Sequence, residues 1–505
     1  MDCRRAFSPP PPATAPSSPW RNWSGTQEVY AKHVLRPHSL QDLQQVIREA
    51  TERGGRARVV ATGLSFSDVL QADDTLIEAT GLMGEGGAVL LPLEQELWRD
   101  PQHVEPLVRI VCGARIRHLN AALACAGLGF ENLGGYDGQT MIGAISTSTH
   151  GSGLKIPPLC DGVRGLDLVS TGGKFFRLEP TSGLTCPKKY RERYGASRTL
   201  VQNDAEFWAA VVSLGCLGVV YSVTMKVRSA YRLRERRTLR RWGEVKAELC
   251  SSRAPLEHVR NYEVAINPYL RRDGDYTCLV TERWLAEPNL ATVPLPDARQ
   301  QAENLTFTPS TQSAIQALME SEPRLIAGIL ETGLEALVTA VDHVDDSFVV
   351  YNIGKINTAD VVSGEYFFPL SGAGYLQGIQ AILDTVERNR GEGIHQTTPL
   401  ALRFVKNSQA SLSMAQAEPH ATVEMSLWRH QPGAVEALLS YERACLAHHG
   451  RPHWGELHLL TGDKAWFTAA YPRHQAWLRV YDKYNDRGVF DNHFTDRVLK
   501  GIART

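Results

Sequence analysis

The stretch of the chain best suited to holding a ligand is the glycine-rich segment 132–153. It carries six glycines among serines and threonines and is almost without charge. Glycine lets a backbone come close to a ligand, so such a path suits an extended cofactor. A flexible linker fits poorly, because Ile142, Ala144 and Ile145 are apolar and should be packed. The segment has neither the Gly-Lys-Ser/Thr ending of a Walker A loop nor the G-x-G-x-x-G fingerprint of dinucleotide-binding turns.

Two further segments have the composition of ligand-binding turns. In segment 59–68 a β-branched strand runs into a turn of small hydroxyl residues. Backbone N–H groups freed at such a turn bind anions, and Ser and Thr hydroxyls add donors. An ordinary strand-to-loop transition stays open as the alternative. In segment 213–224 a glycine-rich turn leads into a β-rich strand, which by itself indicates little.

Alternating helices and strands are expected to position these segments. Apolar residues recur at helical spacing over 39–53, with Ser39 as the N-cap, and a strand follows over 56–63. Residues 107–134 repeat the pattern as a strand, a helix and a return. Further on, 313–341 and 372–390 are predicted helices, and 347–353, 399–405 and 421–427 are predicted strands. The alternation predicts an α+β or α/β fold, whose second half is a sheet with helices on one side.

Composition bounds the class of protein. The 505 residues are enough for about two to four domains. Lys and Arg number 54 against 55 Asp and Glu, a net charge of −1 that argues against a nucleic-acid binder with a strongly basic surface. No apolar run reaches the roughly 18 residues of a membrane span. Nine cysteines lie far apart without a Cys-x-x-Cys pair, so neither a disulfide framework nor a metal site is expected. We expect a cytoplasmic protein.

The first 19 residues are rich in proline. They lack the apolar core of about 7–15 residues that a signal peptide needs. Such a tract buries too little apolar area to offset its chain entropy, so we expect a disordered tail.

The three segments, in this order, resemble the flavin-binding (PCMH-type) domain of the vanillyl-alcohol-oxidase superfamily, in its branch of aldonolactone and alditol oxidases. Further support comes from residues 365–369, from Arg403, from the Arg-Pro-His-Trp-Gly string at 451–455 and from residues 488–492. The resemblance implies an α+β fold with a two-part FAD-binding domain over 25–232 after a tail over 1–24. A cap-like substrate domain with a mixed or antiparallel sheet and flanking helices would cover 233–455, and residues 456–505 would return to the flavin domain.

The resemblance also implies which residues contact FAD. The diphosphate would lie on the loop 61–67 and on the glycine-rich segment, and the flavin ring at the edge of the cap domain with His453 near it. By matching position, the contacts are Thr62, Gly63, Leu64, Ser65, Ser67, Gly134, Gly143, Ser146, Thr147, Thr149, His150, Gly151, Gly153 and Val219.

One departure concerns how the flavin is attached. Many relatives bind FAD covalently through a histidine that follows the glycine at position 63. This chain has Leu64 there, which carries no nucleophilic atom, and Cys160 does not match the cysteine attachment of a neighbouring branch. We therefore predict FAD bound without a covalent link.

The substrate side departs further. Alditol-type relatives have Glu-x-Arg where this chain has Ala401-Leu402-Arg403. The strand that carries a catalytic histidine and a threonine in such enzymes aligns with Glu424 and Ser426, and the lysine of His-Trp-x-Lys is replaced by Glu456.

These changes alter the charge of the site. Arg403, Glu424 and Glu456 sum to about −1 if all are ionised. Arg403 can pair with one glutamate, and the other then needs a partner or its pKa rises. Three hypotheses stay open. One or both glutamates face solvent, a glutamate of raised pKa is the catalytic base, or the pocket receives a cationic or amine-bearing substrate.

The activity that the resemblance implies is FAD-dependent oxidation. A CH–OH group of a polyol, lactone or sugar-like substrate would give hydride to flavin N5, and O₂ or another acceptor would reoxidise the flavin. The catalytic candidates are Arg403, Glu424, Ser426, His453 and Glu456. The alternatives are oxidation of an amine-bearing or specialised metabolite, and a flavin-binding protein without catalysis. The sequence assigns neither the substrate nor the oligomeric state.

Overall fold

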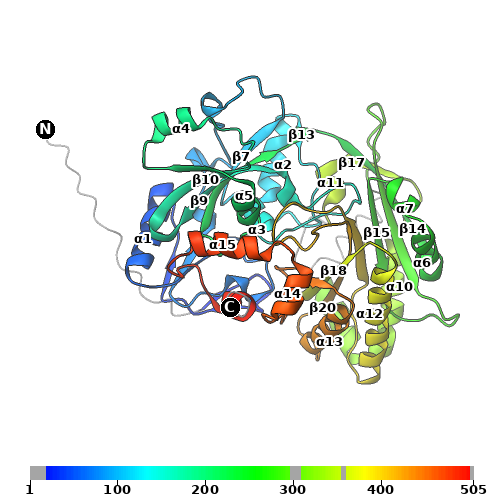
Figure 1. Cartoon of the computed structure of the whole chain (residues 1–505). Coiled ribbons are helices and arrows are strands. Elements are labelled where there is room, and N and C mark those ends of the chain that lie inside the picture. Colours follow the sequence, from blue (N-terminus) through cyan, green and yellow to red (C-terminus); the bar gives the residue numbers. More distant parts are fainter. Residues whose placement is uncertain (1–18, 296–308, 354–359, 501–505) are drawn as a thin grey trace.

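The computed structural model describes residues 19–295, 309–353 and 360–500 (Figure 1). Residues 1–18 of the predicted tail lie outside the described part of the chain. Strand β1 (Trp20–Arg21) pairs with β2 (Glu28–Val29), so the ordered part of the chain begins before residue 25. Within the described residues, every helix is too short or too polar to cross a bilayer.

The first half of the chain forms two sheets. The smaller is parallel, in the order β3 (His33–Leu35), β5 (Thr75–Glu78) and β4 (Ala57–Val60). The larger has the order β11 (Thr199–Gln202), β10 (Lys174–Glu179), β9 (Val163–Ser170), β12 (Val219–Lys226), β7 (Leu107–Val111) and β6 (Leu90–Leu91). A short pair joins β8 (Leu128–Gly129) to β13 (Arg228–Ser229).

Four of the helices of this half are α1 (Leu40–Glu52), α2 (Ile116–Cys125), α4 (Pro187–Tyr194) and α5 (Asp204–Val211). The predictions for 39–53, for the strand that follows it and for the strand and helix after residue 107 are confirmed. Ser39 caps α1 by accepting a hydrogen bond from the Asp42 amide at 3.1 Å. Of the predicted return that follows Gly127, only Leu128–Gly129 is a strand.

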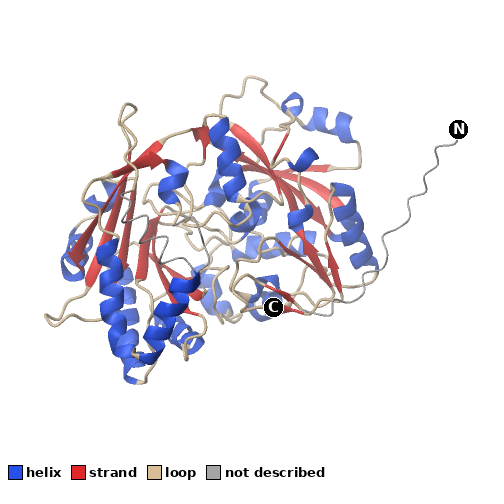
Figure 2. Ribbon diagram, turned by 180° about the vertical axis from the view of Figure 1, so that it is seen from behind, coloured by secondary structure: helices blue, strands red, loops and turns tan. Residues whose placement is uncertain are grey.

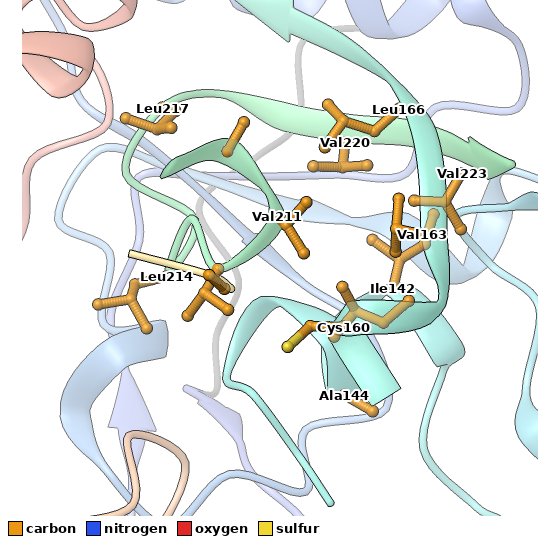
Figure 3. Packing of buried hydrophobic residues seen from close by; sticks show 14 of the residues in the cluster. Ile142, Ala144, Cys160, Val163, Leu166, Val211, Leu214, Leu217, Val220 and Val223 are labelled. Carbon is orange, nitrogen blue, oxygen red and sulfur yellow. The ribbon is translucent and has the colours of Figure 1, made fainter. Parts of the chain in front are cut away.

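The glycine-rich segment contains a short helix, α3 (Met141–Ser146). Figure 3 shows Ile142 on this helix beside Val163 of the larger sheet, and Ala144 belongs to the same buried core. Ile145 is buried in the same core. The segment is therefore part of the packed core and not a linker, as its apolar residues predicted.

The second half forms one sheet with the strand order 17-14-16-15-19-20-18-21. Its strands are β14 (Arg232–Arg241), β15 (Asn261–Ile266), β16 (Thr277–Leu285), β17 (His343–Asp346), β18 (Val361–Pro369), β19 (Leu400–Val405), β20 (His420–Trp428) and β21 (Arg451–Pro452). The helices of this half are α6 (Trp242–Ser251), α7 (Ala254–Glu257), α9 (Pro309–Ser321), α10 (Ile326–Ala336), α11 (Ser347–Tyr351), α12 (Gly374–Gly391) and α13 (Ala434–Ala447). All these strand pairs are antiparallel.

The two faces of this sheet differ in chemistry. Helices α6, α7, α10, α12 and α13 contact one face, where alternate strand residues such as Val264, Leu402 and Val423 are buried. The other face carries Arg403, Glu424 and Glu365, which alternate with those apolar residues along their strands. Figure 2 shows the two large sheets in separate halves of the molecule, with loops between them. The prediction of a sheet with helices on one side is confirmed.

The predicted strand over 347–353 is wrong. The strand there, β17, ends at Asp346, and residues 347–351 form the helix α11. The run is rich in β-branched and aromatic residues, but strand propensity is weak against tertiary packing. Val350 and Tyr351 pack into the core of the first half, which fixes the helix.

The last part of the chain returns to the first half. Helices α14 (Lys464–Ala470) and α15 (His474–Tyr484) follow the last strand. The Trp477 indole donates to Ala209 O at 3.1 Å, which holds α15 against α5. The Ala57 amide donates to Val489 O at 2.6 Å, so residues near 490 lie beside β4.

Candidate active site

A cavity lies between β4, α3 and the turn that precedes β12. All three segments singled out in the sequence line it. The predicted cofactor residues in its wall are Thr62, Gly63, Leu64, Ser65, Gly143, Ser146, Thr147, Thr149 and Val219.

The turn after β4 is held in place by backbone contacts. Gly63 has φ +67°, and a Cβ there would lie 2.8 Å from the Trp20 ring, so this position needs glycine. The Phe66 amide donates to Gly455 O at 2.7 Å. The Ser67 hydroxyl donates to Trp454 O, also at 2.7 Å, and turns away from the cavity. The turn is thus joined to the His-Trp-Gly string across almost 400 positions of sequence.

The other predicted cofactor residues, Gly134, His150, Gly151 and Gly153, are not in the cavity wall. A Cβ at Gly151 would collide with Leu133 O, and one at Gly134 would lie 3.3 Å from His150 O. The Gly153 amide donates to Phe404 O at 2.6 Å and so ties the segment to β19. Gly134 and Gly151 thus allow close packing within the glycine-rich segment, and Gly153 allows close packing against the second half.

Residues of the cavity wall that were not predicted from sequence include two glycines and an arginine. Gly215 and Gly218 lie in the third segment, and Gly218 (φ +138°) packs against Val169 O. The arginine is Arg58, which is 2 % exposed. Its guanidinium donates to the carbonyl oxygens of Val69, Leu214, Gly215 and Phe490. The sequence signal that could have pointed to Arg58 is a basic residue inside a strand rich in valine.

His453, Gly455 and Glu456 line one end of the cavity. His453 Nδ1 accepts a hydrogen bond from the Gly455 amide at 3.1 Å, so a neutral ring carries its proton on Nε2. Burial, with His150 and Arg403, lowers the pKa of His453 to about 4, although Glu365 opposes the shift. The ring is therefore uncharged at neutral pH.

Beside this end lies a cluster of charged residues on the open face of the eight-stranded sheet. Arg403 Nη1 lies 2.8 Å from Glu424 Oε2 and 3.6 Å from Glu365 Oε1. Glu365 Oε1 lies 3.2 Å from His150 Nε2. Burial opposes the ionisation of Glu365, but His150, His453 and Arg403 hold the pKa of Glu365 well below its usual range.

Strand register explains why these residues meet. Glu365 lies directly opposite Glu424, and Ser363 directly opposite Ser426. The Ser426 hydroxyl lies within hydrogen-bond distance of Ser363 Oγ at 3.1 Å and of Glu424 Oε1 at 3.2 Å. In the sequence, Glu365 was noted only within residues 365–369, which support the family resemblance. Its place in the cluster depends on the pairing of β18 with β20, which no local sequence pattern predicts.

Glu456 is the carboxylate that Arg403 does not pair with. Its Oε2 is buried and has no hydrogen-bond partner among the described residues. Burial and then the charges of Glu424 and Glu365 raise the pKa of Glu456 well above its usual value, although a hydrogen bond from Ser363 and the charge of Arg403 oppose the shift. The hypothesis that the glutamates face solvent is therefore not supported.

The cavity fits a cofactor such as FAD. Its wall offers backbone N–H groups, hydroxyls and glycines, and the buried Arg58 cation contributes positive charge that suits a diphosphate. When bound there, FAD would accept a hydride. The residues in the wall would hold it by backbone and hydroxyl contacts.

Comparison with known proteins decides the family. The FAD binding domain model matches residues 31–179, and the model described as D-arabinono-1,4-lactone oxidase matches residues 223–498, more than half of the chain. The chain belongs to the D-arabinono-1,4-lactone oxidase family. Members of this family are FAD-dependent oxidoreductases, so the resemblance, the cofactor and the class of enzyme predicted from the sequence are confirmed.

Relatives in this family match along the whole chain. L-gulono-1,4-lactone dehydrogenase of Mycobacterium tuberculosis is 27 % identical over 493 residues, which cover 95 % of this chain and 99 % of the relative. L-gulonolactone oxidase of Scyliorhinus torazame is 21 % identical over 492 residues, with 95 % and 98 % covered. Cholesterol oxidase from B. sterolicum has the same fold, with a TM-score of 0.73 at 15 % identity over 96 % of this chain and 97 % of that one. The fold predicted from the resemblance is thereby confirmed.

Proposed function

We propose that this member of the D-arabinono-1,4-lactone oxidase family oxidises a hydroxyl-bearing carbon of an aldono-1,4-lactone and transfers the hydride to FAD. The observation that carries the proposal is that the cavity ends at His453 and Glu456, beside Arg403 and Glu424. The names of the relatives, which act on gulono-, galactono- and arabinono-lactones, support the choice of substrate class.

The residues at this end have separate tasks. Only one nitrogen of the Arg403 guanidinium is engaged by described side chains, so its other N–H groups can donate to lactone oxygens. Glu456 receives the hydroxyl proton, because its Oε2 has no partner and its raised pKa makes its carboxylate a strong base. His453 Nε2–H is a fixed neutral donor at the same end.

The proposal includes FAD that is not covalently attached. Leu64 lies in the cavity wall at the position of the histidine that links FAD in many relatives. Cys112 also lines the cavity, but burial raises the pKa of its thiol to about 12, so it is not a reactive thiolate. After acid precipitation, flavin colour in the supernatant is the expected result, and colour retained in the pellet would contradict it.

The test of the activity is anaerobic mixing of the yellow protein with aldono-1,4-lactones of the D and the L series. Loss of the flavin absorbance near 450 nm (roughly the oxidised flavin band) with at least one lactone is the expected result. Readmission of O₂, or of an artificial acceptor, then shows which acceptor restores the colour. A protein that holds FAD but is bleached by none of the lactones would contradict the proposal.

A further inference from the structure

A further carboxylate lies beside Arg403 on the open face of the eight-stranded sheet. Glu263 on β15 is directly opposite Arg403 on β19. Paired residues of antiparallel strands point to the same face, so Glu263 shares the face that carries Arg403 and Glu424. Adjacent strands are roughly 4.8 Å apart, and β15 lies on the side of β19 away from β20, β18 and β21. Glu263 is therefore next to Arg403 on the side that faces away from His453, which follows β21.

One oxygen of this carboxylate is held and the other is free. Arg283 Nη1 lies 2.6 Å from Glu263 Oε1. Arg283 is itself fixed by Glu235, whose Oε2 lies 2.8 Å from the arginine Nε. The side chain of Arg283 is 4 % exposed, whereas that of Glu263 is 27 % exposed. Glu263 Oε2 forms no hydrogen bond or ion pair with a described residue, so it is available to a ligand.

The charge of Glu263 suits a neutral hydrogen-bond donor. Burial opposes the ionisation of Glu263, but Arg283 and Arg403 hold its pKa below its usual value. Because these two arginines flank it, the carboxylate needs no cation from a ligand. An ionised carboxylate accepts hydrogen bonds and donates none, so its free oxygen fits a hydroxyl group. Hydrogen bonds to a charged acceptor are roughly twice as strong as those between neutral groups.

We infer that Glu263 is a specificity-determining residue, whose free oxygen accepts a hydrogen bond from an exocyclic hydroxyl of the lactone. The inference rests on the proposed function, in which the reacting carbon lies by Glu456 and Arg403 donates to lactone oxygens. The part of the substrate beyond Arg403 then extends toward β15. In an aldono-1,4-lactone that reacts at a ring carbon, that part is the exocyclic chain.

The first measurement compares substrates on the wild-type holoenzyme. A six-carbon aldono-1,4-lactone that bleaches the flavin is paired with its 5-deoxy and 6-deoxy analogues, each of which lacks one exocyclic hydroxyl. The value of kcat/KM is expected to fall at least about tenfold for one of the two analogues, the effect of losing a hydrogen bond to a charged acceptor. Equal kcat/KM for the lactone and both analogues would overturn the inference.

The second measurement removes the acceptor. In Glu263→Ala, kcat/KM for the lactone and for that analogue should agree within about threefold, because no carboxylate remains to be left unpaired. Glu263→Gln keeps the size of the side chain and an oxygen for Arg283, so its ratio should fall between those of Glu263→Ala and the wild type. A ratio of two substrates measured on one protein is insensitive to loss of folded or flavin-loaded enzyme.

The matched control is Glu235→Gln. Glu235 contacts the same Arg283 but lies on β14, two strands beyond Glu263 and farther from Arg403. This variant weakens the same chain of ion pairs and should lower the melting temperature, while the ratio of the two substrates stays as in the wild type. A ratio that falls in Glu235→Gln as far as in Glu263→Ala would contradict a direct contact between Glu263 and the substrate.

The outcomes separate the inference from the proposed function. If no lactone bleaches the flavin, the proposed function fails and the inference falls with it. If lactones bleach the flavin but Glu263→Ala discriminates against the deoxy analogue as strongly as the wild type does, the inference alone fails.

Discussion

Arg403 and Glu424 form an ion pair along a diagonal of the sheet. Arg403 lies directly opposite Thr422, yet its Nη1 reaches Glu424 Oε2 at 2.8 Å. On β19 the residue directly opposite Glu424 is Ala401, and paired residues of antiparallel strands point to the same face. A carboxylate at 401, on the arginine's own strand, or at 424, on the neighbouring strand, can therefore serve the same arginine.

Moving the carboxylate across the sheet should preserve the site. Glu424→Gln leaves Arg403 short of a partner and should lower kcat/KM for a lactone at least about tenfold, since breaking a partly buried pair is costly. The double variant Ala401→Glu, Glu424→Gln should recover most of that loss. The matched control Ala401→Gln, Glu424→Gln has the same size but no carboxylate and should not recover. Equal activity of the two double variants would contradict a role for charge.

The pH dependence of turnover should report Glu456. A base must be ionised, and the pKa of Glu456 is raised, so kcat/KM should rise as pH passes upward through that raised pKa. The groups that face it are Glu424, Glu365, Arg403 and Tyr136. Burial and Glu424 raise the pKa of Tyr136, so Tyr136 stays neutral over this range.

Glu456→Gln supplies the check on that profile. It should lower the rate of flavin reduction by about 10²–10⁴-fold and remove the rising limb. Stopped-flow reduction at several pH values measures both effects. A rising limb that persists in Glu456→Gln would assign the base elsewhere. His453, with its pKa of about 4, would not give a limb near neutral pH.

Arg58 should couple FAD binding to the packing of the cavity wall. Its guanidinium holds the carbonyls of Val69, Leu214 and Gly215, all of which line the cavity, and that of Phe490 near the end of the chain. Arg58→Met leaves these carbonyls unpaired at about 1–3 kcal/mol for each buried group. We expect a lower melting temperature of the apoprotein and a dissociation constant for FAD at least about tenfold higher.

A matched variant distinguishes this coupling from general destabilisation. Arg451 is also buried and donates to a carbonyl, Met414 O at 2.8 Å, but it is not in the cavity wall. Arg451→Met should lower the melting temperature with little change in FAD affinity. Fluorescence titration of apoprotein with FAD compares the two. An unchanged affinity in Arg58→Met would contradict the coupling.

Gly151 should matter for stability and not for direct cofactor contact. A Cβ there would collide with the backbone oxygen of Leu133 and with the Asn132 amide at 2.8 Å. Gly151→Ala should therefore destabilise the fold by about 1–3 kcal/mol, as overpacking does. The control Gly172→Ala lies in open space but has φ +73°, so it tests the cost of backbone conformation alone. Thermal unfolding with and without FAD measures both. A loss in Gly151→Ala no larger than that in Gly172→Ala would contradict the packing role.

Features that depend on local sequence patterns could be predicted, whereas features that depend on contacts between distant segments could not. The helix at 372–390 and the strands at 399–405 and 421–427 follow from local periodicity, and the structure has them as α12, β19 and β20. The pairing of one glutamate with Arg403, and the raised pKa of the other, followed from charge counting alone. The structure assigns the pair to Glu424 and the raised pKa to Glu456.

Interactions between distant segments could not be read in this way. Glu365 joins the cluster only because β18 pairs with β20, and nothing near Glu365 in the sequence specifies that pairing. The glycine-rich segment predicted that its backbone comes close to a ligand. In the structure Gly143 lines the cavity, whereas Gly151 and Gly153 pack against other parts of the backbone. Glycine permits both, so its presence alone cannot say which partner is near.

The contacts of the turn after β4 set the order of events when the protein is made. This turn is fixed by Gly455 O, and the strand before it by Val489 O and Phe490 O. Chains fold from the N-terminus as they emerge from the ribosome, yet the part matched as a FAD binding domain ends near residue 179. The FAD-binding domain therefore cannot enclose FAD until some 300 further residues have been synthesised. Loading of FAD becomes a late, near-final step of biosynthesis, and a nascent chain stalled in the eight-stranded sheet would be colourless.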